Sequence, residues 1–396
     1  MKKEKFNIYK IKMKKILVVN NKYKIKGGED SNIIDEVKLL KSKYKVSYLE
    51  FDNSKKINFF DVLAFFTNSN FYSNYLFKKK VDSFEPDIVY LHNLWFKGNL
   101  GIIRISHKKK IQTLVKVHNF RYHCANSFLI KRHLDHKSVC NACNLKSSSN
   151  NFFNKYFEES FIKSIFLIIY IKKLLKLIKN YNIKILTITE FHQKFLMDLN
   201  IKSQNLFYYP NPIQRITSLG SVDSIKSKQI IYAGRLSVEK GIRELLQTWS
   251  SLDLNDYILS VYGTGPLENE LLKKFSNKNI KFYGDVENSE VLNAIANSKA
   301  VVTSTKMFEG QPRLLSEASI LGIPSIFPLF GGMGEFFPND YSYAFEQFNY
   351  VDLQKKIINL FDDEIYNYEK NRVQNYIISK LDEEKQLEIF SEILIS

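Results

Sequence analysis

Short runs of apolar residues that end at a glycine or a polar turn recur along the chain. The clearest are residues 15–20, 230–233, 260–262, 280–283 and 300–303. Such runs, followed by stretches of helical periodicity, predict alternating strands and helices. In the second half, strand-to-glycine junctions follow one another at Gly234, Gly263 and Gly284. Because alternating strands and helices build parallel sheets, we expect these junctions to gather at one sheet edge.

Two acids eight positions apart, Glu309 and Glu317, lie between the last of these strands and a helix that is predicted to start near Pro312. This places one carboxylate on a loop facing the helix N-terminus and the other about a turn and a half into the helix. Carboxylates accept hydrogen bonds from sugar hydroxyls, and a helix N-terminus favours a nearby diphosphate. The pattern therefore points to a sugar nucleotide.

Two cations occupy the earlier junction, where residues 230–241 predict a strand, a glycine turn and a helix start. We expect Arg235 and Lys240, which lie in this turn, to be able to bind a pyrophosphate. A guanidinium fork and an ammonium are the groups expected to neutralise the charge that grows on a departing nucleotide diphosphate.

With these elements in order, the chain resembles glycosyltransferase family 4, the retaining enzymes of the GT-B fold. The resemblance rests on Gly234-Arg235-Leu236-x3-Lys240-Gly241, Gly263-x-Gly265, Phe282-x-Gly284 and Glu309-x7-Glu317, and on Gly27-Gly28 and residues 86–95, 115–121 and 209–213 in the first half. It covers about residues 13 to 375 and implies an α/β fold, with two Rossmann-like doubly wound domains facing a central cleft. The expected boundaries are 1–212 for an acceptor-binding domain, 213–375 for a nucleotide-sugar domain and 376–396 for a helix that packs back on the first domain.

The resemblance also implies roles for individual residues. Glu309 would hold the donor sugar and Glu317 the ribose, while Arg235 and Lys240 would bind the diphosphate. The donor site would also include Gly263, Gly265, Gly310, Gln311 and Pro312, and an acceptor or phosphate loop would include Gly27, Gly28 and His92. The expected catalytic set is Glu309, His118, Arg235 and Lys240.

Two histidines at predicted strand ends belong to these expectations. His118 would hydrogen-bond the donor sugar or the reacting hydroxyl, or else pair with backbone at its strand end. His92 occupies a comparable place. The chain departs from the family at Gln311-Pro312-Arg313, whose amide and guanidinium would contact the donor or cap the helix. Glu335 in the later glycine-rich loop is a further possible sugar contact, or an exposed loop acid.

The metal and cofactor expectations are limited. No Asp-x-Asp occurs in the chain, which argues against a divalent ion at the diphosphate, so the expected co-substrate is a UDP- or GDP-sugar without a catalytic cofactor. Three cysteines, Cys124, Cys140 and Cys143, fall in one window with His123, His133 and His136. Their spacing predicts either reduced thiols or a structural zinc site.

Charge is distributed unevenly along the chain. Residues 1–220 hold 40 Lys and Arg against 16 Asp and Glu, whereas the rest hold 18 against 25. The basic half suggests an anionic acceptor or the anionic inner membrane surface, with a solvated lysine surface as the alternative and no nucleic-acid module in view. Residues 161–179 predict a helix that is either half buried or interfacial, since their uncharged run is too short to span a bilayer. The first twelve residues lead into the first strand without an apolar core, so we do not expect them to act as an export signal.

The expected function is a hexosyltransferase-type, retaining transfer of sugar from a nucleotide sugar to a lipid-linked glycan. Such a reaction would serve surface polysaccharide assembly, as in capsule or lipopolysaccharide, on the cytoplasmic face of the membrane. No enzymic nucleophile is evident, so the retention would follow a front-side displacement. The alternatives are a GT-B sugar-nucleotide epimerase and a non-catalytic protein that binds a sugar nucleotide or nucleic acid.

Overall fold

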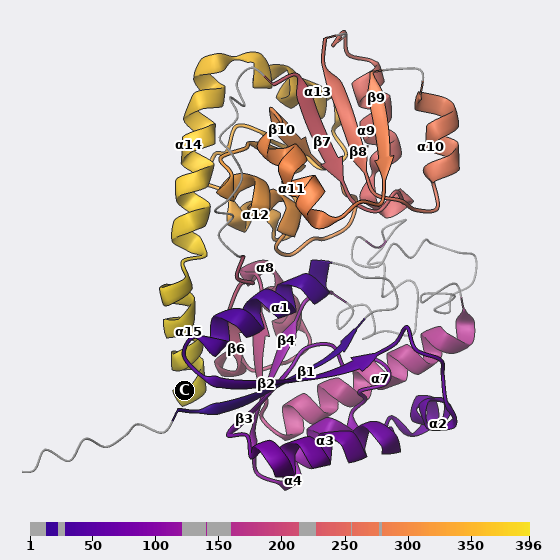
Figure 1. Ribbon diagram of the computed structural model, residues 1–396, viewed down its shortest axis with the longest axis vertical. Coiled ribbons are helices and arrows are strands. Elements are labelled where there is room, and N and C mark those ends of the chain that lie inside the picture. Colours follow the sequence, from indigo (N-terminus) through magenta and orange to yellow (C-terminus); the bar gives the residue numbers. More distant parts are fainter. Residues whose placement is uncertain are drawn as a thin grey trace, which may run out of the picture. The chain divides into compact units, whose positions relative to one another are not determined.

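The computed structural model describes residues 13–22, 28–120, 140, 160–213, 227–254, 256–276 and 279–396. The chain divides into two compact units, Met1–Val117 with Leu177–Ile185 and His118–Lys176 with Leu186–Ser396 (Figure 1). The domain boundaries at residues 212 and 375 remain predictions.

The first sheet has six strands in the order β2-β1-β3-β4-β5-β6. These are β1 (Lys15–Lys22), β2 (Lys45–Asp52), β3 (Ile88–Leu91), β4 (Gln112–Val117), β5 (Lys184–Thr187) and β6 (Leu206–Tyr208). β1 pairs in parallel with β2 and β3, and six consecutive residues of it are buried. A strand covered on both faces needs an unbroken apolar run, which explains why the run at residues 15–20 was visible in the sequence.

The helices of this half are α1 (Gly28–Lys41), α2 (Phe59–Thr67), α3 (Phe71–Phe84), α4 (Gly101–Lys108), α7 (Phe161–Asn180) and α8 (Glu190–Asp198), with the short η1 (Ser203–Asn205) before β6. α7 covers the segment predicted as half buried or interfacial. Its apolar positions, including Leu167, Ile171 and Leu174, are buried, while its lysines at 163, 173, 176 and 179 are exposed. The structure therefore buries the apolar face of this helix. Among the described residues, no helix is both long and apolar enough to cross a bilayer.

A charged pair lies inside the first unit. The Lys116 ammonium on β4 is 2.8 Å from the Glu36 carboxylate on α1, and both side chains are almost completely buried. The Tyr90 hydroxyl on β3 donates to the other Glu36 oxygen at 2.5 Å. Burial lowers the pKa of Lys116, and the charge of Glu36 opposes that shift. Buried ions need such partners because desolvation is costly.

The second sheet also has six strands, in the order β12-β11-β10-β7-β8-β9. They are β7 (Gln229–Ala233), β8 (Ile258–Tyr262), β9 (Ile280–Gly284), β10 (Ala300–Val302), β11 (Ser325–Pro328) and β12 (Ala344–Phe345). The register is parallel throughout the sheet. With the first sheet, it confirms the predicted doubly wound α/β class and the glycine junctions at the carboxyl ends of β7, β8 and β9.

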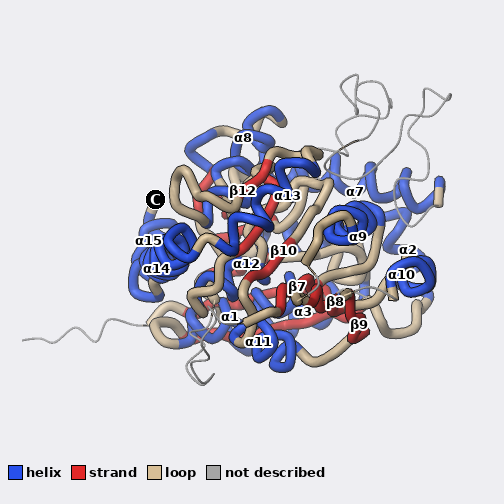
Figure 2. Tube along the Cα trace, turned by 90° about the horizontal axis from the view of Figure 1, so that it is seen from above, coloured by secondary structure: helices blue, strands red, loops and turns tan. Residues whose placement is uncertain are grey.

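Helices cover both faces of the second sheet (Figure 2). α9 (Ile242–Ser250) and α13 (Tyr350–Ile358) pack together on one face, and α11 (Asn288–Ala296) and α12 (Arg313–Ile320) on the other. The short α10 (Glu268–Phe275) links β8 to β9. The apolar core between these layers includes Trp249, Leu246 and Phe327.

The chain ends in two long helices after the short η4 (Asn359–Phe361): α14 (Asp363–Lys380) and α15 (Glu383–Ile395). Asp362 caps α14 by accepting from the Ile365 amide at 3.1 Å. α14 packs on α12, where the Gln374 amide donates to the Ile320 carbonyl at 2.8 Å. In α15, the ring of Phe390 lies 5.4 Å from that of Tyr209, just after β6.

Candidate functional site

The glycine turns at the carboxyl edge of the second sheet interlock through their backbones. The Gly234 amide donates to the Tyr262 carbonyl at 3.0 Å, and the Gly263 amide donates to the Gly284 carbonyl at 2.6 Å. Gly263 has φ +114°, and a Cβ there would lie 2.2 Å from the Gly234 oxygen. Because no other residue fits this contact, glycine is required for the β7 and β8 turns to meet.

Gly241 brings the β7 loop against the loop after β10. Its φ is +66°, and a Cβ there would lie 2.0 Å from the carbonyl oxygen of Ser304. The Ser304 hydroxyl donates to the Gly241 carbonyl at 2.8 Å. This close approach places Lys240, at the end of the short η2 (Val238–Lys240), beside the segment that carries Glu309.

Lys240 and Glu309 form an ion pair at this edge. The ammonium contacts Oε1 of Glu309, to which the Thr305 hydroxyl also donates at 3.3 Å. Both side chains are partly exposed, so the pair remains open to a ligand. The charge of Glu309 is the main cause of a raised Lys240 pKa, so the acid favours the charged form of the ammonium. The structure thus brings together an acid and a base that lie 69 residues apart in the chain.

Arg235 supplies a second cation near the pair. Its side chain is exposed and forms no ion pair with any described residue, and its positive charge acts to lower the pKa of Lys240, five positions further along the same loop. The Tyr232 hydroxyl donates to the Arg235 carbonyl at 3.1 Å. Burial raises the pKa of Tyr232, with Glu309 as the next cause. Tyr232 and Thr305 were missed by sequence reasoning, because strand-end hydroxyls carry no distinctive spacing.

The second acid, Glu317, is engaged differently from Glu309. It is buried in α12, where one carboxylate oxygen accepts from Nε of Arg313 at 2.8 Å. The helix begins at Arg313, directly after Pro312, as predicted. Arg313 is thus the partner of an acid one helical turn away, and contact between Glu317 and a ribose stays a prediction.

The side-chain amide of Gln311 forms two hydrogen bonds with the backbone of Asn211. The Asn211 amide donates to Gln311 Oε1 at 2.6 Å, and Gln311 Nε2 donates to the Asn211 carbonyl at 2.9 Å. The side chain is buried. In this structure Gln311 therefore holds residues 209–213 against the loop before α12. Its predicted contact with the donor sugar nucleotide remains a prediction.

Phenylalanine rings hold the loop that carries Glu309. The ring of Phe308 lies 5.6 Å from Phe120, 5.1 Å from Phe191 and 4.6 Å from Phe330. Since His118 lies two residues before Phe120, this cluster anchors the His118 segment to the acid loop within the second unit. His118 itself is half buried at the end of β4.

Glu335, the further possible sugar contact, caps a helix. Its two carboxylate oxygens accept from the amides of Glu190 and Phe191, each at 2.8 Å, at the start of α8. An acid at a helix N-terminus is stabilised by the free amides and the positive end of the helix. The loop before it does lie beside the candidate site, because the Gly332 amide donates to the Glu309 carbonyl at 2.8 Å.

The remaining predicted residues lie elsewhere. His92 follows β3 in the first unit and is 4% exposed, and burial followed by the charge of Lys116 lowers its pKa well below the usual value. Gly28 begins α1, and Gly265 packs against Leu236. Cys140 is buried. Gly27, Cys124 and Cys143, with the histidines at 123, 133 and 136, lie outside the described residues, so the zinc site stays a prediction.

His192 in α8 is a buried histidine that sequence reasoning did not single out. Burial lowers its pKa to about 3. Between pH 6.5 and pH 3 the unfolded chain therefore binds a proton that the folded chain does not, so stability falls as pH falls. We expect wild type to lose about 2 kcal/mol more than His192→Gln between pH 6.5 and pH 5, measured by urea denaturation. Parallel pH profiles of the two proteins would contradict this assignment.

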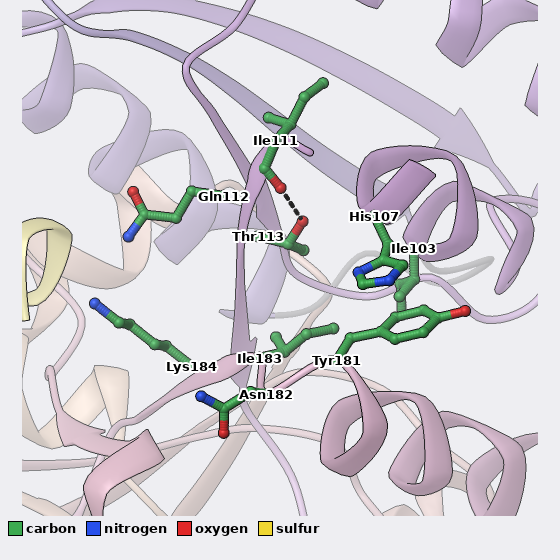
Figure 3. Close-up of a pocket in the computed structure, with 9 residues that line it drawn as sticks. All are labelled: Ile103, His107, Ile111, Gln112, Thr113, Tyr181, Asn182, Ile183 and Lys184. Carbon is green, nitrogen blue, oxygen red and sulfur yellow. Dashed lines mark hydrogen bonds between the residues drawn. The ribbon is translucent and has the colours of Figure 1, made fainter. Parts of the chain in front are cut away.

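A pocket of about 170 Å³ lies in the first unit, at the end of the first sheet where β4 and β5 begin (Figure 3). The rings of His107 and Tyr181 stack in it with centroids 3.7 Å apart. Gln112 and Lys184, which also line it, are the first residues of β4 and β5. The pocket is therefore at the amino ends of the strands, whereas His92 follows a carboxyl end. None of the predicted site residues lines it.

Known proteins resemble this chain in sequence and in fold. Residues 222–378 match the family of glycosyl transferases group 1. The amylovoran biosynthesis glycosyltransferase AmsD of Erwinia amylovora is 25% identical over 149 residues, which is 36% of this chain and 42% of that protein. The chain thus spans less than half the length of this curated relative.

Solved structures extend the likeness to the whole fold. HepE of Anabaena, in complex with UDP and glucose, matches with a TM-score of 0.67 and 14% identity over 96% of this chain and 99% of HepE. A TarM variant of S. aureus, in complex with fondaparinux, alpha-GlcNAc-glycerol and UDP, matches with a TM-score of 0.58 and 18% identity over 82% of this chain and 58% of TarM. The chain has the GT-B fold, and its residues 222–378 match the glycosyl transferases group 1 family.

Proposed function

We propose that this protein is a glycosyltransferase that moves a hexose from a nucleotide sugar to a glycan acceptor. The observation that carries the proposal is the Lys240–Glu309 pair at the carboxyl edge of the second sheet, with Arg235 beside it. This edge is where parallel α/β sheets bind ligands. It also lies within the residues that match the glycosyl transferases group 1 family.

Each group has a chemical task in the proposed reaction. Arg235 and Lys240 neutralise the negative charge on the departing nucleotide diphosphate. Glu309 accepts hydrogen bonds from the donor sugar hydroxyls and keeps Lys240 in place. The free amides at the start of α12 favour a phosphate nearby. With these groups the sugar is transferred with retention, by a front-side displacement in which the leaving diphosphate takes the acceptor proton. The same proposal includes His118, which would hydrogen-bond the donor sugar or the reacting hydroxyl.

The donor and acceptor classes are supported by the relatives. HepE was solved with UDP and glucose, and TarM with UDP and a GlcNAc-glycerol. AmsD is named for the biosynthesis of amylovoran. We infer a UDP-sugar donor, with a GDP-sugar as the second choice, and a lipid-linked glycan acceptor in surface polysaccharide assembly. The excess of lysine and arginine in residues 1–220 favours an anionic acceptor.

A panel of UDP- and GDP-hexoses tests this proposal. We expect slow hydrolysis of one donor by the purified protein, and faster consumption with a new glycosidic product when lipid-linked acceptors are added. Consumption of the donor at full rate without acceptor, giving an epimeric nucleotide sugar, would favour a GT-B epimerase. Tight binding of a nucleotide sugar with no turnover under any condition would favour a binding protein.

Arg235 provides a separate prediction for the diphosphate contact. Because the guanidinium is exposed and has no ion-pair partner among the described residues, Arg235→Ala should leave stability unchanged. Loss of one charge-assisted contact should weaken UDP binding by about 10- to 100-fold, measured by calorimetry. Arg243→Ala, which removes a partly exposed cation paired with Glu270, is the control and should bind UDP as wild type does. Equal affinities of wild type and Arg235→Ala would remove Arg235 from the site.

A further inference from the structure

Helix α2 in the first unit buries one acid and a narrow apolar strip, and it leaves most of its aromatic rings exposed; Phe65, whose ring stacks on Phe96, is the inward one. The two buried residues of α2 are Asp61 and Ala64, whereas the rings of Phe59 and Phe66 are 70% and 62% exposed. Helices of water-soluble domains turn their apolar stripe to the core and their polar face to water. α2 instead leaves Phe59, Phe60, Val62 and Phe66 exposed to solvent.

A buried polar network explains how this orientation is held. Asp61 accepts from the Asn58 amide at 3.0 Å and from Asn70 Nδ2 at 2.8 Å, and the Lys97 ammonium lies 3.6 Å away. Asn70 in turn caps α3 by accepting from the Ser73 amide at 3.1 Å. These contacts join the start of α3 to α2 through buried polar groups, and they involve none of the exposed rings.

Helix α3 continues the apolar surface and adds positive charge to it. Phe71 and Tyr75 are 71% and 60% exposed. Lys78 is exposed as well and lies on the same face, because residues three and four apart are neighbours on a helix. The opposite face, with Phe77 and Val81, is buried.

We call the exposed part of residues 57–79 the aromatic surface. Its main apolar side chains are Phe59, Phe60, Val62, Phe66, Phe71 and Tyr75. Residues 53–80 contain five lysines and one acid, and that acid is the buried Asp61. The next acid, Asp82, is paired with Lys109 at 2.7 Å. The surface is therefore both apolar and positively charged, and large exposed apolar patches on a protein mark contact sites.

We propose that the aromatic surface docks on an anionic lipid bilayer. Exposed aromatic rings seat at the headgroup level, and nearby lysines are attracted to anionic lipids. A second copy of the chain fits less well, because a two-fold contact would set the same lysines against one another. Docking itself does not depend on the proposed function. Its consequence does, because docking would hold the enzyme at the membrane, where a lipid-linked acceptor lies.

Flotation of the full chain with vesicles tests the docking. We expect binding to equimolar phosphatidylglycerol and phosphatidylcholine at low salt, and little binding to phosphatidylcholine alone. Combining Phe59→Ser, Phe66→Ser and Phe71→Ser should weaken binding about 10-fold or more. Combining Lys78→Glu and Lys79→Glu should weaken it at least about 25-fold.

Matched variants separate docking from other effects. Tyr368→Ser on α14, which also removes an exposed ring, and Ile162→Ser on α7 should bind vesicles as wild type does. The serine triple variant should keep wild-type donor hydrolysis without acceptor, and Glu309→Gln should keep wild-type vesicle binding. Loss of turnover with intact docking would therefore count against the proposed function alone. The docking proposal would be overturned if the serine triple variant bound vesicles as wild type does. It would also be overturned if wild type were a dimer and the variant lost the dimer but kept vesicle binding.

Discussion

Glu309→Gln is expected to lower kcat/KM for sugar transfer by about 100-fold or more. The substitution removes a charged acceptor for the donor hydroxyls and the ion-pair partner of Lys240 in one step. Losses of about 100- to 1,000-fold are typical when one pre-organised polar group is removed from a transition state. The measurement is steady-state transfer from the donor that the hexose panel identifies.

A control for this result is available in the same unit. Glu270→Gln also neutralises a carboxylate in an ion pair, with Arg243, but on an exposed surface, and should leave kcat/KM unchanged. The urea midpoint of Glu309→Gln should stay close to that of wild type, because the pair is partly exposed. A Glu309→Gln protein that keeps half or more of the wild-type kcat/KM would remove Glu309 from the proposed mechanism.

Lys116→Met should lower the free energy of unfolding by about 3 to 5 kcal/mol. The ammonium is the cation partner of the buried Glu36 carboxylate, with Tyr90 donating to its other oxygen. Breaking a buried pair on one side leaves an uncompensated charge, and this penalty exceeds what the lost contact alone contributes. Urea denaturation followed by tryptophan fluorescence and circular dichroism provides the measurement.

Two further variants identify the cause of that loss. Lys116→Met combined with Glu36→Leu should recover most of the lost stability, since replacing both ions by apolar groups is often neutral. Lys109→Met, which breaks the exposed pair with Asp82, should change stability by about 0.5 kcal/mol or less. If the double variant is as unstable as Lys116→Met, lost packing rather than the unpaired charge is the cause.

Much of the fold and part of the site could be predicted from local patterns. Apolar runs indicated β1 and β10, and runs that end at a glycine indicated β7, β8 and β9, because a strand buried on two faces needs continuous apolar residues. The order of the glycine turns and charged residues indicated which loops share an edge, and the Lys240–Glu309 pair then formed between two of them. The start of α12 was visible because proline favours the beginning of a helix.

Other contacts depended on which distant residues meet. Nothing near Gln311 indicated that its amide would be taken up by Asn211, one hundred residues earlier. Glu335 looked like a loop acid until α8 supplied two free amides to it. Glu36 and Lys116 lie 80 residues apart with no shared motif, so their pairing was not predicted.

The sequence by itself predicted several central strands, a parallel arrangement of those in the second half and the residue types at the candidate donor site, because backbone periodicity and glycine requirements are local. Only the tertiary structure decided which charges pair, which acids cap helices and that α2 turns its aromatic rings outward. Those outcomes depend on desolvation and on hydrogen-bond partners, and both are set by segments that approach one another only when the chain folds.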